Sequence, residues 1–145
     1  FKMMYDMEEI FLERALYIAG ELRDSVYMAE ALHKFAELRI DENQFSQAKD
    51  YLDKALVLLP KNNNILRAEY NKDLARVYLG MNVPDTALFY IDAALRYAHP
   101  YELERSCNIV KGSIYMKMRR YKDAESVFMK NIESLPLKDK YDIFF

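Results

Sequence analysis

The chain has 145 residues, of which 52% are hydrophobic and 30% charged, a length and composition that suit one domain with a sizeable core and exclude disordered or collagen-like chains. Its 21 basic and 23 acidic residues almost cancel, so we expect no nucleic-acid partner for this segment. No apolar run approaches the roughly 18 to 20 residues that span a bilayer, so we expect no membrane insertion.

The first predicted helix covers residues 1–20. Apolar residues recur there at intervals of three or four, which is the period of a helix with one buried face. Gly20 can lie inside the last turn or end the helix. The residues expected on the buried face are Ile10, Leu12, Ala15, Leu16 and Ala19.

The second and third helices are predicted over residues 26–42 and 45–59. Asp24 can cap the second helix, because its carboxylate can accept the unpaired N–H groups of a first turn. Asn43 tolerates the left-handed conformation that ends many helices. Pro60 stops the third helix, because a proline ring cannot continue the backbone hydrogen bonding.

The fourth helix is predicted over residues 65–81, and the fifth begins at Pro84, whose missing N–H is not needed in a first turn. The dipeptide at 99–100 opens the sixth helix, and the seventh runs from about residue 121 to 135. Alternation with a period of two and Gly-rich hairpin turns are missing, so no strand is expected.

The second, fourth and sixth of these helices are each followed by a similar helix. Ala87 follows Ala48 by 39 residues, and Ala124 follows Ala87 by 37. Self-similarity at this period indicates stacked helix pairs that share a core. The recurring residues are Ala48, Leu52, Ala55 and Pro60, then Ala87, Ile91, Ala94 and Pro100, then Ala124, Phe128 and Pro136.

With these residues the chain resembles the tetratricopeptide repeat family, as a divergent variant with long repeats. The preceding helices also fit, through Phe35 with Ala36, Leu74 with Ala75 and Tyr78, and Gly112 with Tyr115. The departures are Arg39 and Lys111 in place of an aromatic and a bulky apolar residue, and Asn131 in place of a small residue.

The resemblance implies an all-α, right-handed superhelix of about seven helices. Since the chain starts with Phe1 rather than Met, it is expected to be a segment of a longer protein. The implied organisation is a second helix of a truncated repeat at 1–22, repeats at 24–60, 62–99 and 100–136, and the start of a further helix at 137–145.

No pattern of residues points to catalysis, and the chain is predicted not to be an enzyme. The three glycines form no phosphate-binding loop, so no cofactor is expected. His33 and His99 are not at the spacing of a metal-binding pair, and no metal site is expected. No histidine lies near Cys107 in sequence to activate it as a nucleophile.

The resemblance also implies a concave groove lined by the first helix of each pair. An acidic strip would lie beside a basic one, which leaves two readings: neutralisation between stacked repeats, or a grip on a charged peptide. Glu37 and Asp73 would face a ligand with the wrong sign for the family's clamp on a C-terminal carboxylate. The tentative partner-binding residues are His33, Glu37, Ile40, Glu69, Lys72, Arg76, Leu79, Ile109, Ser113 and Met116.

The predicted function is a non-enzymatic scaffold that binds a protein or peptide partner through this groove. The alternative is a sensory or oligomerising segment of a bacterial transcription or signalling regulator. Apolar residues near both ends indicate either that more repeats flank this segment or that two copies bury these ends together as a homodimer through uncapped ends. The sequence favours a cytoplasmic location, or a periplasmic one if a signal peptide was removed.

Overall fold

Seven helices and no strand make up the described part of the chain, which is residues 2–98 and 101–134 of a computed structural model. This confirms the predicted all-α class. The helices are α1 (Lys2–Leu22), α2 (Ser25–Asp41), α3 (Phe45–Leu58), α4 (Asn64–Gly80), α5 (Pro84–Leu95), α6 (Tyr101–Lys117) and α7 (Tyr121–Glu133).

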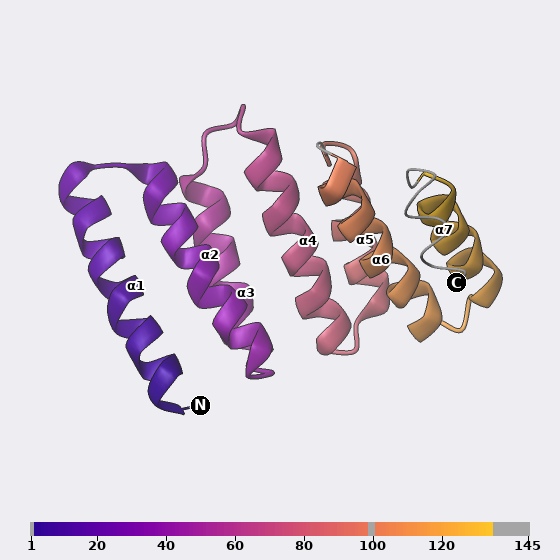
Figure 1. The fold of residues 1–145 in the computed structure, drawn as a ribbon, viewed down its shortest axis with the longest axis horizontal. Coiled ribbons are helices and arrows are strands. Elements are labelled where there is room, and N and C mark those ends of the chain that lie inside the picture. The colour runs from indigo at the N-terminus through magenta and orange to yellow at the C-terminus, as the bar shows by residue number, and fades with distance from the viewer. Residues whose placement is uncertain (1, 99–100, 135–145) are drawn as a thin grey trace.

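The helices pack mainly against their neighbours in sequence, as a helical repeat requires. The closest pairs are α2 with α3, α4 with α5, and α6 with α7, and α4 also contacts both α2 and α6. They form a row with α1 at one end and α7 at the other (Figure 1). The predicted start of a helix at 137–145 lies outside the described residues, and the right hand of the superhelix stays a prediction.

The same turn joins the two helices of every pair. Its central residue has a left-handed backbone, with φ of 59° at Asn43, 63° at Asn82 and 60° at Arg119. The next residue donates its N–H to a carbonyl five residues back, which closes the end of the first helix. These bonds are Gln44 to Arg39 (2.7 Å), Val83 to Tyr78 (2.9 Å) and Arg120 to Tyr115 (2.9 Å).

The predicted helix starts are confirmed at several points. The Asp24 carboxylate accepts the N–H of Tyr27 at 3.0 Å, and the Asn63 side chain accepts that of Leu66 at 3.3 Å. Pro84 is the first residue of α5. Of the two options left open for Gly20, the structure has the first, because the helix continues past it to Leu22.

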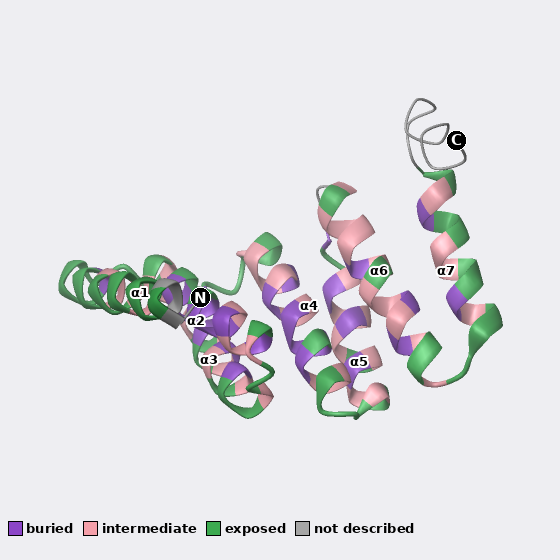
Figure 2. Cartoon of the chain, turned by 60° about the horizontal axis from the view of Figure 1, so that its bottom comes forward, coloured by how far each residue is buried: buried purple, intermediate pink, exposed green. Residues whose placement is uncertain are grey.

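Small residues of the second helices are completely buried, which confirms their predicted register (Figure 2). Ile10 was assigned wrongly to a buried face, because it is 56% exposed. The reason is that the main contact of α1 within the described chain is with α2, and Ile10 does not lie in that contact. The residues of α3 and α5 that are 0% exposed are Ala48, Leu52, Ala55, Ala87, Ile91 and Ala94.

Two departures from the family pattern are ion pairs between successive repeats. Arg39 of α2 pairs with Glu9 of α1, and Lys111 of α6 pairs with Asp92 of α5 at 2.8 Å. In both, a basic residue of a first helix meets an acidic residue of the preceding second helix. These ion pairs therefore join successive repeats at positions where an apolar residue would do so by packing.

The third departure, Asn131, is buried and fully engaged. Its amide donates to the Arg105 carbonyl at 3.0 Å and accepts from Asn108 at 3.3 Å, so it links α7 to α6. Close approach of the same two helices explains Gly112, because a Cβ there would lie 2.3 Å from the Phe128 ring. None of the described helices has the length and apolar character needed to cross a membrane.

Ala55 tests this packing. We expect Ala55→Leu to lower the free energy of unfolding by about 1–3 kcal/mol, because the extra atoms overpack the contact of α3 with its neighbours. Val57→Leu on the same helix is the matched control, since Val57 is 84% exposed. Chemical denaturation measures both, and equal stability of Ala55→Leu and the parent would contradict the register of α3.

Candidate functional site

A cleft of about 810 Å³ lies where α2, α4 and α6 meet, on the side formed by the first helices of the pairs. It brings together six of the ten residues proposed from the sequence. The other residues that line it come from the ends of α2, α4 and α6, the middle of α6, the turn after α2 and the start of α3. The six predicted residues are Ile40, Arg76, Leu79, Ile109, Ser113 and Met116.

The lining is mostly apolar, with a few charges. Ile109 is 52% exposed and Met116 is 49% exposed, so large apolar side chains are open to solvent there. Arg76, Lys117 and Asp41 are the charged residues of the lining. An exposed apolar surface with a charged surround is typical of a protein-binding site.

Six lining residues were not among the ten tentative partner-binding residues: Asp41, Asn43, Phe45, Gly80, Val110 and Lys117. Phe45 opens α3, and Asn43 lies in the turn before it, whereas the expected groove used first helices only. Gly80 at the end of α4 and Val110 in α6 also line the cleft. The Phe45 ring packs directly on Gly80, since a Cβ added at residue 80 would lie 2.4 Å from the ring. The start of α3 and the end of α4 therefore form one wall of the cleft.

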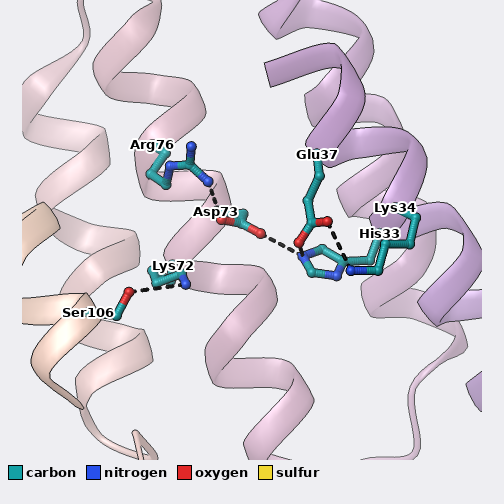
Figure 3. Close-up of polar contacts among 7 residues, drawn as sticks. All are labelled: His33, Lys34, Glu37, Lys72, Asp73, Arg76 and Ser106. Atoms are coloured by element: carbon teal, nitrogen blue, oxygen red, sulfur yellow. Dashed lines mark hydrogen bonds and ion pairs between the residues drawn. The ribbon is translucent and has the colours of Figure 1, made fainter. Parts of the chain in front are cut away.

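His33 was expected on the groove surface but is buried, with 4% of its surface exposed. Its ring lies 4.5 Å from the Tyr70 ring, and its Nε2 lies 2.5 Å from Asp73 Oδ2 and 3.4 Å from Glu37 Oε1 (Figure 3). With Asp73 ionised, His33 Nε2–H is the donor. His33 therefore joins α2 to α4 rather than facing a ligand in the cleft.

Asp73 was also expected to face a ligand, and this too is wrong, because it is only 2% exposed. Its second oxygen accepts from Arg76 at 3.0 Å. Burial alone would raise the pKa of Asp73, but the hydrogen bond from His33 and the charges of His33, Lys72 and Arg76 outweigh it and lower the pKa.

Charged residues of the predicted acidic and basic strips are largely paired with other residues of the protein. Lys34 donates to Glu37 at 3.1 Å on the same helix, and Lys72 of α4 donates to Ser106 of α6 at 3.2 Å (Figure 3). Together with the Asp73 contacts, these pairs favour neutralisation over a grip on a charged peptide along these strips. Glu69 lies outside the cleft, in a smaller cavity nearer α1.

The sequence argument against a metal site considered histidine pairs alone. In the fold, donor atoms of His33, Glu37 and Asp73 come within 4.8 Å of one another, and these residue types can ligate a cation. Their present geometry is that of a hydrogen-bonded network, because 2.5 Å is a hydrogen-bond distance and Arg76 binds the other Asp73 oxygen.

Cys107 fits the expected role of an ordinary helix cysteine. It is completely buried in α6, and burial raises the pKa of its thiol to about 11. Since the thiolate is the nucleophile, this environment keeps the side chain unreactive near neutral pH.

Comparison with known proteins gives a match in the last helix pair. Residues 106–134, which cover most of α6 and all of α7, match the family model described as Tetratricopeptide repeat. The match supports a relationship to that family, which the sequence resemblance predicts, and the all-helical fold is consistent with it. No curated protein matches the chain.

Asp73 provides a test of the buried network. We expect Asp73→Ala to lower the free energy of unfolding at pH 7 by about 3–5 kcal/mol, because it removes the buried carboxylate that both His33 and Arg76 contact. Asp53→Ala is the control, since the exposed pair of Asp53 with Lys49 is worth at most about 1 kcal/mol.

The same pair of variants should respond differently to pH. The pKa of Asp73 is lower in the folded chain than the roughly 3.9 of an unfolded aspartate, so its contribution is complete above that value. It disappears as the pH falls through the folded-state pKa. Urea denaturation at a series of pH values from 7 downward should therefore show the defect of Asp73→Ala shrinking once the pH falls below about 3.9, and a defect that stays constant down to the lowest pH at which the parent folds would contradict this account.

Proposed function

We propose that this chain, a relative of the tetratricopeptide repeat family, is a protein-interaction scaffold whose cleft between α2, α4 and α6 binds a segment of a protein partner. The family is generally one of non-catalytic interaction modules, and the match at 106–134 supports that general role here. The cleft, its binding residues and the partner class are the proposal.

The observation that carries the proposal is the convergence of three first helices on one partly apolar cleft. Ile109 and Met116 supply exposed apolar surface, and Arg76 and Lys117 supply positive charge beside it. Met is a flexible side chain that adapts to irregular partners. A partner segment with apolar side chains and an acidic residue would complement this lining.

The cleft is tested by Ile109→Asp combined with Met116→Asp, which places two carboxylates on its apolar surface. We expect recovery of a protein partner in affinity capture to fall at least about tenfold, because buried unpaired charges oppose docking. Phe89→Asp with Tyr97→Asp is the control, since both residues are exposed and lie on or after α5, away from the cleft.

Substitution of Arg76 would be a poorer test. Arg76 pairs with the buried Asp73, so its reversal to Glu would disturb the fold as well as the cleft. Loss of partner recovery in the control variant, or equal recovery by parent and double variant, would count against the cleft.

A second proposal is self-association through α1. Much of α1 is exposed (Figure 2), and its main contact within the described chain is with α2. Its exposed residues include a row of large apolar side chains, and exposed apolar faces are typical of interfaces. The exposed apolar residues of α1 are Met3, Met7, Ile10, Phe11, Tyr17, Ile18 and Leu22.

The spacing along α1 is self-complementary. If two copies of α1 pack antiparallel about their midpoints, Met3 faces Leu22 and Met7 faces Ile18 of the other copy. Phe11 then faces Arg14, a favourable cation–π arrangement. A second copy of this chain is therefore the occupant that we propose for this face. The regulator hypothesis fits such a dimer, but it concerns the whole protein and rests on no further observation.

Sedimentation velocity over a concentration series tests the dimer. We expect a monomer–dimer equilibrium for the parent, and Phe11→Glu with Ile18→Glu to remove the dimer by placing charges in the apolar contact. Val57→Glu with Phe89→Glu adds the same charge elsewhere and should leave the equilibrium unchanged. A parent that stays monomeric at high micromolar concentration would overturn the proposal.

A further inference from the structure

A second, smaller cavity lies at the α1 end of the inner face, separate from the cleft described above. Its volume is about 350 Å³, at the small end of the range for ligand sites. Part of its wall is apolar, from Leu12 and Ala15 of α1. The sequence pattern did not identify it, because α1 was expected to be part of the scaffold only.

The polar side of this cavity is acidic. Glu30 of α2 and Glu69 of α4 both line it, and no ion pair joins either carboxylate to another described side chain. Lys34 also lines it, but its ammonium group binds Glu37 at 3.1 Å. His33 lies at the same wall and is held by Asp73. The charges left for a ligand are therefore the two carboxylates.

Tyr70 gives independent evidence that the cavity is incomplete without a ligand. It lines the cavity and is 0% exposed, and its hydroxyl has no hydrogen-bond partner among the described protein groups. Burial raises the pKa of Tyr70, and the negative charges of Glu30, Glu69 and Glu37 raise it further. A buried hydroxyl left unsatisfied is rare in folded proteins.

A second tyrosine is placed to stack on a ligand. Tyr27 lines the cavity from α2 and is 45% exposed, so its ring remains available. A planar cation can lie over such a ring, and its N–H groups can reach carboxylates and a hydroxyl at the same time. Arginine meets these requirements better than lysine, because its guanidinium has five donors in a flat, stackable group.

We propose that this cavity binds an arginine side chain of the protein partner, with Glu30 and Glu69 accepting from its guanidinium and Tyr70 supplying a further acceptor. The arginine stem would lie along the apolar wall of α1, as long basic side chains do. This inference rests on the proposed function, and it adds one requirement to the partner: an arginine at the α1 end of the bound segment.

The test uses N-acetyl-arginine amide as the probe and the intact 145-residue chain, labelled with ¹⁵N for NMR. We expect the amide signals of residues that line the cavity, such as Glu69 and Tyr70, to shift on titration. N-acetyl-citrulline amide has nearly the same shape without the charge, and it should bind at least about tenfold more weakly. N-acetyl-lysine amide should fall between the two.

Glu30→Gln with Glu69→Gln is the decisive variant, since it keeps shape and removes both charges. We expect it to weaken binding of the arginine probe at least about tenfold. Glu125→Gln with Glu133→Gln makes the same change on exposed positions of α7 and should leave binding unchanged. Thermal unfolding verifies that both variants fold. Equal affinity for arginine and citrulline probes, shifts confined to other residues, or unchanged binding by Glu30→Gln with Glu69→Gln would overturn the inference.

The result is independent of the cleft test. Probe binding at Glu69 and Tyr70 together with unchanged partner recovery by Ile109→Asp with Met116→Asp would support the cavity and reject the cleft. Loss of partner recovery in that cleft variant without probe binding would do the reverse.

Discussion

The fold depends on the close approach of helices at alanine positions. Ala48, Ala55, Ala87 and Ala94 are all completely buried, and a larger side chain at any of them would push two helix axes apart. This spacing determines how each second helix packs on its first helix. It also leaves the first helices side by side, because each second helix contacts the first helix of the next pair as well.

Polar contacts between successive repeats also restrict how the helices can pack. His33 with Asp73 joins α2 to α4, and Lys111 with Asp92 joins α6 to α5. The His33–Asp73 contact is buried, and such a contact contributes little net stability compared with apolar packing, although breaking it is costly. Its effect here is to hold α2 against α4 at one register, and the cleft and the smaller cavity both lie across that contact.

The two hollows of the inner face differ in their chemistry. The cleft of α2, α4 and α6 has exposed apolar residues with Arg76 and Lys117 beside them, while the cavity at α1 has Glu30 and Glu69. A bound segment that used both would need different side chains at its two ends. Such a segment would also dock in one direction only, because the reverse orientation brings like charges together.

The sequence by itself determined the helices, their limits to within a few residues, and the faces of the second helices. These depend on local periods and caps, so Asn43, Asp24 and the alanines could be placed without any partner in view. The sequence also gave six residues of the cleft, because a helical repeat carries the same face from one copy to the next. It failed where the answer depends on which neighbour lies opposite. Ile10 is exposed because the main contact of α1 within the described chain, with α2, does not cover it, and His33 is buried because Asp73, far away in the chain, faces it. Helical periodicity specifies the side of a helix on which a residue lies, but only tertiary packing decides whether solvent, a core or a charge meets it there.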